Sequence, residues 1–506
     1  MSEDGRTVTF VDGDAGARPL ARTTAQESRP ATRAGVELRG AAGSISKTVT
    51  LFALLIGMAN AGLLYIAPET SALRLVLASA MLWVAALPSL EFAIRTPRQA
   101  PLFPLINAFY FMYFGLPVFL DTVSVRFHRY DKPEVTVAVA ITLAGLLAMQ
   151  LAFFSPIGKI ADALPRLKLR VDLERVAWMF IVLSTLGVVA AAWILLGKLP
   201  PSLRAVANTT SRMPLVMLSG VLVLHLRGQA TFHQRLIALA LYVVYLLLSL
   251  ATGAMAQVMW ALVPMFFVYV AERGRIPWAA GLLCLVLVIP FAHAKHAFRR
   301  EIRRADYGAV ERVSLFLGLT YDGLVEGGQD FVEDASRTSG DRISYLGTFA
   351  YVIRQTPGRV PYMDGETYRV MLWSFVPRVL APSKPTQELG QQFGHRYGLL
   401  NPRDYATSFN CAQIVEMYLN FGHLGVLVGM ALVGLYYRAL YALFNHGDGG
   451  DGMLLVASST LAGLLNIESD ASMVLVGAFH AAAFGFVVLL AVQFVADRAL
   501  GGAAPR

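Results

Sequence analysis

Long apolar runs recur along most of the chain, and short polar segments separate them. A helix needs about 20 mainly apolar residues to cross the roughly 30 Å hydrocarbon core of a membrane. The stretch from Leu236 to Ala271 has 36 residues without a charge, too many for one span, so we divide it at Ala251–Met255. The runs at 213–226 and 453–466 are short, which is typical of tilted or re-entrant helices. The pattern predicts twelve spans, at 48–67, 71–94, 101–120, 135–156, 176–197, 213–226, 236–251, 254–271, 277–294, 417–444, 453–466 and 472–496.

Composition supports a membrane protein. Hydrophobic residues make up 56% of the 506 residues and charged residues 15%, whereas roughly a quarter of a globular protein is charged. These values exclude a disordered chain, a collagen-like fibre and a small disulfide-linked secreted module. Cys284 lies in an apolar run and Cys411 in a polar one, so we expect them at different depths and unpaired, without redox or zinc chemistry. The predicted fold class is an all-α polytopic membrane protein.

The placement of lysine and arginine predicts the orientation, because cytoplasmic segments carry the excess of positive charge. With the N-terminus inside, the cytoplasmic segments hold 21 of the 43 basic residues and the short outside loops hold 7. The other 15 lie in the long segment 295–412, and long loops escape the charge rule. We therefore expect both termini in the cytoplasm and one large loop outside.

This orientation divides the chain into five parts: a disordered cytoplasmic tail (1–47), nine spans (48–294), a large outside loop with amphipathic or re-entrant helices (295–412), three spans (413–496) and a cytoplasmic tail (497–506). The first part lacks a short apolar stretch followed by a small-residue cleavage site, so no cleaved signal peptide is expected. The segment Gly447–Gly452 is interpreted as a flexible turn rather than a phosphate-binding loop, because no strand precedes it.

The long outside segment contains most of the candidate chemistry. It begins with a basic stretch, 295–304, in which cations repeat at helical spacing. Such a helix either attracts anionic lipid or binds a substrate diphosphate. The cations considered for diphosphate binding there are Arg299, Arg300 and Arg303. The acidic stretch 322–334 is interpreted as a solvated surface, and no metal is expected because the histidines lack metal-ligand spacing.

Aromatic and acidic residues follow in a turn region rich in proline and glycine. Aromatic rings beside carboxylates suit sugar faces and hydroxyls, although a packed corner explains the same residues. The candidate sugar-binding residues are Tyr362, Asp364, Glu366, Tyr368 and Trp373.

The segment 373–385 contains three prolines that constrain its backbone, with Arg378 and Lys384 between apolar residues. A guanidinium and an ammonium held in this way favour an anion site, to which Arg396 can contribute. His395 and Glu416 follow, and Glu416 comes just before a predicted span. A carboxylate at such a position is costly unless paired, so Glu416 is either a site residue or the partner of a loop arginine. His395 is either a second base or a surface histidine.

These residues resemble those of the bacterial O-antigen polymerase (Wzy-type) and exopolysaccharide repeat-unit polymerase family. The resemblance rests on the stretch from Thr356-Pro357 to Tyr368, on Pro377-Arg378 with Lys384-Pro385, and on Tyr418–Gly425, and it covers about 130 residues. It implies a multi-span enzyme of the bacterial inner membrane, with a glycosyltransferase-C-like architecture and a large periplasmic loop. It also implies a metal-independent transfer between undecaprenyl-diphosphate-linked oligosaccharides, without a cofactor or nucleic acid.

Under this resemblance, Arg378 and Lys384, with Arg299 or Arg300, stabilise the leaving diphosphate, and Glu416 or His395 is the base for the acceptor hydroxyl. The expected partners are membrane lipid, a chain-length regulator and a flippase. An O-antigen ligase would use a similar diphosphate site with another acceptor. A transporter or flippase would require charged, broken spans in paired halves, and the sequence contains neither. A non-catalytic scaffold in polysaccharide export is the third alternative.

Overall fold

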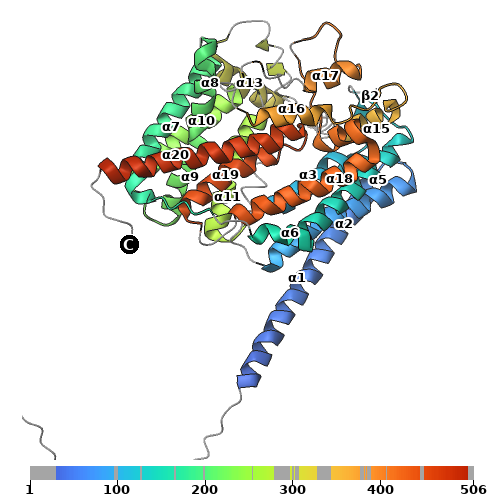
Figure 1. Ribbon diagram of the computed structural model, residues 1–506, viewed down its shortest axis with the longest axis horizontal. Helices are drawn as coiled ribbons and strands as arrows, with labels where there is room; N and C mark the ends of the chain where they lie inside the picture. Colours follow the sequence, from blue (N-terminus) through green and yellow to red (C-terminus); the bar gives the residue numbers. More distant parts are fainter. Residues whose placement is uncertain are drawn as a thin grey trace, which may run out of the picture. The chain divides into compact units, whose positions relative to one another are not determined.

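The computed structural model describes the chain as a helical protein (Figure 1). The described residues are 30–95, 101–125, 128–163, 167–197, 200–253, 255–277, 294, 297–298, 301–302, 307–326, 344–376, 381, 383, 389–405, 407–444 and 449–499. The helices are α1 (Pro30–Ile66), α2 (Ala72–Arg95), α3 (Leu102–Tyr110), the π-helix η1 (Phe111–Gly115), α4 (Leu116–Leu120), α5 (Glu134–Phe154), α6 (Pro156–Ile160), the 3₁₀-helix η2 (Ala161–Ala163), α7 (Leu173–Leu195), α8 (Pro201–Thr210), α9 (Met213–Leu226), α10 (Phe232–Ala251), α11 (Met255–Arg273), α13 (Ala309–Glu326), α15 (Leu346–Gln355), α16 (Glu366–Ser374), α17 (Leu389–Arg396), α18 (Gln413–Phe444), α19 (Asp451–Leu464), the π-helix η3 (Ser472–Val476) and α20 (Gly477–Ala499). Two strands, β1 (Ser124–Val125) and β2 (His128–Arg129), pair antiparallel.

The chain divides into two compact units, residues 1–50 and 51–506. In the first unit, α1 begins at Pro30, so residues 30–47 are helical where the sequence analysis placed a disordered tail. The reason is that a composition unable to bury a core still contains enough Ala, Leu, Arg and Glu for local helix propensity. Residues 1–29 lie outside the described part.

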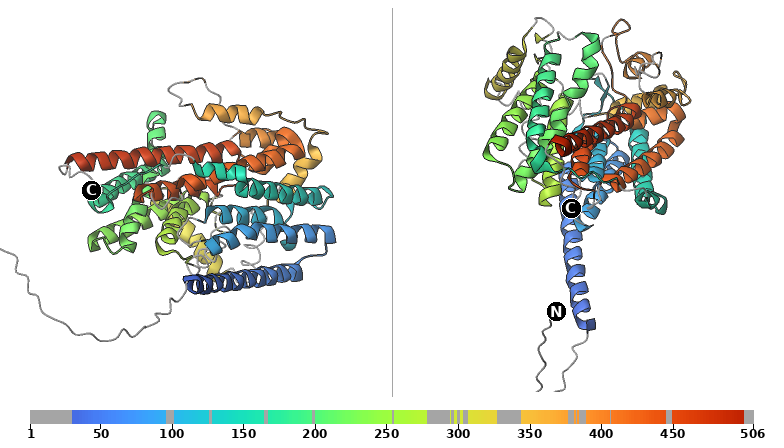
Figure 2. Two further views of the ribbon diagram at one scale, coloured as in Figure 1. Left: turned by 60° about the horizontal axis from the view of Figure 1, so that its bottom comes forward. Right: turned by 60° about the vertical axis from the view of Figure 1, so that its left-hand side comes forward.

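Nine helices of the described chain are long and apolar enough to cross a membrane: Ile45–Ile66, Ala72–Ile94, Leu102–Leu120, Glu134–Phe154, Leu173–Leu195, Val206–Leu226, Phe232–Ala251, Gln413–Phe444 and Ser472–Ala499. Two further predicted spans correspond to α11, which has 19 residues, and to α19, which has 14. Most of the predicted span 277–294 lies outside the described residues. In the left view of Figure 2, the helices α20 (red), α5 (teal) and α2 (blue) run in nearly the same direction. This pattern is that of a multi-pass membrane protein.

The loops of the second unit form two groups, at opposite ends of α5. At its C-terminal end, the Leu169 amide donates to the Gly449 carbonyl at 3.0 Å. In the same group, Arg227 forms ion pairs at 2.7 Å with Glu272 and Asp451 and so joins the ends of α9, α11 and α19.

At the N-terminal end of α5, the β hairpin lies against α15. The Tyr345 amide donates to the Tyr113 carbonyl at 3.1 Å, and Gly347 packs so closely on the Ser124 backbone that a Cβ would overlap it. Segments far apart in the sequence therefore meet at each end.

The helix α18 is broken. Phe421 (φ −140°, ψ 19°) and Gly422 (φ 62°, ψ −148°) leave the helical conformation, and a φ of this sign favours glycine. Beyond the break, a Cβ on Gly425 would overlap the Met417 carbonyl oxygen, and one on Gly429 would lie 2.6 Å from Met417 Sδ.

In a straight helix, residues eight positions apart are separated by about 12 Å. The chain therefore reverses at Phe421–Gly422, and residues 413–420 (the short arm) lie alongside residues 423–444 (the long arm). The predicted span 417–444 falls within the candidate span Gln413–Phe444, and the break at Phe421–Gly422 lies inside it. The long arm alone has 22 residues, enough for one span.

Candidate functional site

The short arm is a buried helix with one polar face. Gln413, Glu416 and Asn420 are 0% exposed and lie on the same side, at positions i, i+3 and i+7. The arm is held against α5, since a Cβ on Gly145 would lie 3.5 Å from Ile414 Cδ1 and 3.0 Å from Val426 of the long arm. Buried polar side chains destabilise a fold unless they are hydrogen-bonded, so the partners of this face are informative.

Asn420 joins the short arm to α16. Its Oδ1 accepts from the Gly365 amide at 2.9 Å, and its Nδ2 donates to Thr367 Oγ1 and to the Glu416 carbonyl, both at 2.9 Å. The turn before α16 has positive φ at Asp364 (45°) and at Gly365 (87°), which directs the Gly365 amide toward Asn420. The first turn of α16 is therefore fixed on the arm.

Glu416 joins the arm to the connection between α19 and η3. Its Oε2 accepts from the Ala471 amide at 2.7 Å. Its Oε1 is buried and makes no hydrogen bond of ordinary geometry with the described residues, and the Thr367 hydroxyl lies close to the carboxylate. A carboxylate with one oxygen bonded in this way and the other without an ordinary hydrogen bond is held in place and still able to accept a proton.

A cavity of about 300 Å³ lies next to this carboxylate, a volume at the lower end of the range for small-ligand sites. It is lined by Leu389, Gly390, Gln391, Tyr405, Thr407, Ser408, Asn410, Cys411, Ser469, Asp470 and Met473. None of these lining residues is basic, and most have side chains that form neutral hydrogen bonds. The cavity therefore suits hydroxyl groups better than an anion.

Glu416 is not one of the lining residues, but two residues that line the cavity, Cys411 and Asp470, lie close to it. The Cys411 thiol is buried, which raises its pKa, and the Glu416 and Asp470 carboxylates close to it raise the pKa further. Burial also raises the pKa of the Asp470 carboxyl, and Asp470 Oδ1 accepts from the Met473 amide at 2.9 Å at the start of η3. Two carboxylates thus lie close to one thiol at the cavity wall.

Tyr368 of α16 lies close to Glu416 and Cys411. Burial raises the pKa of its phenol, and Glu416 and Cys411 nearby raise it further. Its ring stacks on Phe421 at 6.2 Å, so the break in α18 positions it. Tyr368 therefore remains a neutral hydrogen-bond donor at ordinary pH.

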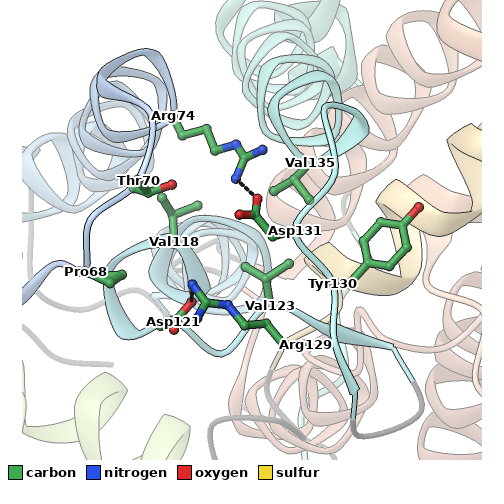
Figure 3. Close-up of a pocket in the computed structure, with 10 residues that line it drawn as sticks. All are labelled: Pro68, Thr70, Arg74, Val118, Asp121, Val123, Arg129, Tyr130, Asp131 and Val135. Carbon is green, nitrogen blue, oxygen red and sulfur yellow. Dashed lines mark hydrogen bonds and ion pairs between the residues drawn. The ribbon is translucent and has the colours of Figure 1, made fainter.

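A second, smaller pocket lies between the start of α2 and the β hairpin (Figure 3). Arg74 is bonded there to Asp131, to Thr136 Oγ1 at 2.9 Å and to the Lys132 carbonyl at 2.9 Å. The pocket has a volume of about 20 Å³, room for about one water molecule. Its charged groups pair with one another, so it holds the loop rather than a ligand.

The family described as Domain of unknown function (DUF8712) matches residues 107–447. The chain belongs to this family. No curated protein and no solved structure matches it. The DUF8712 match includes the whole of α18, and with it Glu416, but ends before Asp470.

The structure brings some of the predicted site residues together. Tyr362 and Tyr368 both lie on the break of α18: the ring of Tyr362 is 6.3 Å from that of Tyr418, and a Cβ on Gly422 would lie 2.7 Å from the Tyr362 hydroxyl. Asp364 belongs to the same turn, as its φ shows. Of these three residues, Tyr368 lies close to Glu416, whereas the Asp364 side chain is exposed, and their role in sugar binding stays a prediction.

Other predicted residues lie elsewhere. Glu366 and Trp373 have exposed side chains on α16. His395 Nε2 lies 3.0 Å from the Asp404 carbonyl, and Arg396 donates to the Pro361 carbonyl at 2.7 Å, so both side chains hold loops together. The remaining predicted cations lie outside the described residues: Arg299, Arg300, Arg303, Arg378 and Lys384.

Sequence reasoning missed Asp470 and Thr367 as site residues. A signal for Asp470 exists, since polar residues crowd the short connection 466–470 between two apolar helices. Nothing in the local sequence relates Asp470 to Glu416, because these two residues lie 54 positions apart in the chain.

Proposed function

We propose that this protein is a polymerase that joins lipid-diphosphate-linked oligosaccharide units at the outer face of the bacterial inner membrane. The observation that carries the proposal is the Glu416 carboxylate, which is fixed through Oε2, without an ordinary hydrogen bond at Oε1 among the described residues, and adjacent to a cavity suited to hydroxyl groups. A general base for a sugar hydroxyl needs both a fixed position and a free oxygen.

In the proposed reaction, a sugar hydroxyl in the cavity attacks the anomeric carbon of the lipid-linked donor. The hydroxyl proton passes to Glu416 Oε1, the new glycosidic bond forms, and the bond to the diphosphate breaks with both electrons leaving on the diphosphate. We assign to Tyr368, which lies close to Glu416, a hydrogen bond donated to the incoming sugar. The lining contains the acidic Asp470 and no basic residue, which disfavours a diphosphate there, so we assign the diphosphate to Arg378, Lys384 and the basic stretch that begins at 295.

The membrane arrangement that fits this function has twelve spans, cytoplasmic termini and an extracytoplasmic segment 295–412. The two groups of loops support it, because segments predicted on the same side contact one another. Arg227, Glu272 and Asp451 meet at the end we assign to the cytoplasm. At the other end, Phe298 and Phe316 pack with Leu250. The cavity then opens outside, and the proposed partners are the lipid-linked oligosaccharide, a flippase and a chain-length regulator, with no cofactor.

The experiment uses the full chain in nanodiscs with lipid-linked oligosaccharides extracted from the cells that carry the gene, and no energy source. Wild-type protein should produce a ladder of lengthened products. Glu416→Gln keeps an oxygen that can accept from Ala471 but removes the base, so it should leave single units. Glu174→Gln, an exposed carboxylate at the start of α7, is the matched control and should still produce the ladder.

Other outcomes point to other functions. A ladder from Glu416→Gln at the wild-type rate would exclude Glu416 as the base. Transfer of the oligosaccharide to a different acceptor without lengthening would indicate a ligase. Absence of a ladder from folded wild-type protein, together with movement of the lipid-linked unit between leaflets in liposomes, would indicate a transporter.

A further inference from the structure

The cavity near Glu416 has an exposed mouth and a buried floor. The exposed lining residues, which form the mouth, are Tyr405, Thr407, Ser408, Asn410 and Met473. The buried lining residues, which form the floor, are Cys411, Ser469 and Asp470. Tyr405 is 75% exposed and Asp470 is 8% exposed. A ligand that enters the cavity therefore meets Tyr405 at the mouth and Asp470, the neighbour of Glu416, at the floor.

Tyr405 is held at the mouth by α17. Gln391 Nε2 donates to the Tyr405 carbonyl at 2.5 Å, and the ring of His395 lies 5.2 Å from the ring of Tyr405, with 34° between their planes. His395 is itself held, since its Nε2 lies 3.0 Å from the Asp404 carbonyl. A ring that is three-quarters exposed contributes little burial energy to the fold. It is, however, available in a fixed position to a ligand.

The walls of the cavity are formed before a ligand binds. The Phe409 amide donates to the Gly390 carbonyl at 3.1 Å, and a Cβ on Gly390 would lie 2.2 Å from Ser408 Oγ, so the mouth packs directly on the first turn of α17. On the floor, Asp470 Oδ1 accepts from the Met473 amide at 2.9 Å. A site whose walls are already packed avoids the cost of ordering them on binding.

The lining combines an aromatic ring with neutral hydrogen-bonding groups. The amide and hydroxyl side chains of the lining are Gln391, Thr407, Ser408, Asn410 and Ser469. A sugar ring has matching surfaces, because its C–H groups form an apolar face and its hydroxyls project from the edge. An aromatic ring covers such a face, and amides and hydroxyls bind such an edge. The volume of about 300 Å³ suits one sugar unit better than a long oligosaccharide.

The charge of the lining selects among sugars. Asp470 is acidic, and none of the lining residues that the structure describes is lysine or arginine. A carboxylate on the ligand would lie near Asp470 and Glu416 without a cationic partner, which is costly. We propose that Tyr405 is the platform on which a sugar ring stacks in this cavity, and that the cavity accepts an uncharged sugar unit and rejects an acidic one. The assignment rests on the proposed function, because it identifies the class of acceptor sugar whose hydroxyl Glu416 activates.

Saturation-transfer NMR tests the sugar platform without any reaction. The full chain in nanodiscs is mixed with oligosaccharide released by mild acid from the lipid diphosphate of cells that carry the gene, and empty nanodiscs give the background. Wild-type protein should transfer saturation to the ring C–H protons of one sugar unit. Tyr405→Ala should reduce this transfer several-fold, and Tyr405→Trp, which keeps an aromatic face, should retain it. The matched control is Tyr321→Ala in α13, because Tyr321 is 65% exposed and does not line the cavity, and it should leave the transfer unchanged.

The same oligosaccharide, with its primary hydroxyls oxidised to carboxylates, tests the selection by charge. Its transfer should be several-fold weaker, and Asp470→Asn, which keeps an oxygen for the Met473 amide, should restore part of it. Equal transfer to both forms in wild-type protein would overturn the selection. No transfer above background in wild-type protein, or equal transfer in Tyr405→Ala, would overturn the platform.

The two proposals fail separately in these experiments. A ladder of lengthened products from wild-type protein, without saturation transfer, would support the polymerase and exclude the sugar platform. Saturation transfer that depends on Tyr405, without a ladder, would support the platform and exclude the polymerase.

Discussion

The reversal of α18 predicts that one glycine-to-alanine substitution in this helix destabilises the protein, which is opposite to the usual effect. Replacing glycine by alanine inside a helix normally stabilises it by up to about 1 kcal/mol, because alanine has the higher helix propensity. At Gly425 the added methyl would overlap the Met417 carbonyl oxygen and lie 2.7 Å from Phe421 Cβ. Neither neighbour can move without shifting the short arm, and overpacking of this kind costs about 1–3 kcal/mol. We therefore expect Gly425→Ala to lower the free energy of unfolding by about 1–2 kcal/mol.

Two other glycines provide comparisons for Gly425. At Gly429 the methyl would meet Met417 Sδ at 2.6 Å, and a flexible side chain can rotate away, so Gly429→Ala should change stability less than Gly425→Ala. At Gly463 of α19 nothing lies within 4 Å of the added methyl, so Gly463→Ala should stabilise the protein by up to about 1 kcal/mol.

The measurement is reversible chemical unfolding in mild detergent, monitored by tryptophan fluorescence. The free energies of unfolding of the three variants are compared at one denaturant concentration. In a straight α18, residues 417 and 425 would be far apart and all three substitutions would stabilise. A Gly425→Ala variant as stable as Gly463→Ala would therefore refute the reversal and, with it, the position of Glu416 beside the cavity.

Two further predictions concern orientation and pH. In a background without Cys284 and Cys411, a single cysteine replaces either the exposed Tyr405 or the exposed Lys159. In intact cells, the cysteine at position 405 should react with an impermeant maleimide and the one at position 159 should not. The opposite pattern would reverse the proposed topology. Burial raises the pKa of Asp470, so the folded state binds its proton more tightly than the unfolded state, and stability falls as pH rises from the ordinary aspartate pKa through the raised one. Asp470→Asn should flatten that fall in unfolding measurements across the acidic range, and an unchanged slope would show that Asp470 does not cause it.

The apolar runs by themselves determined that this is an all-α chain with many membrane-spanning helices, because each run must bury its backbone hydrogen bonds in a helix to enter lipid. The local pattern also indicated Glu416, since a carboxylate next to an apolar run is costly without a role. Those inferences needed only the composition of one segment at a time.

The site itself depended on the tertiary structure. Hydropathy cannot distinguish the short arm from the first turns of the long arm, because both are apolar and α18 continues on either side of the break. The reversal requires the positive φ of Gly422 and the close approaches at Gly425 and Gly429, and these become visible only when the arms are packed.

The cavity is likewise assembled from distant segments, 389–411 and 469–473. Asp470 reaches Glu416 because α19 and the long arm return the chain to the same end of the bundle, where the Ala471 amide meets the carboxylate. The sequence around Glu416 or around Ala471 does not predict that contact. The energy that stabilises it comes from burying whole helices against one another rather than from either residue.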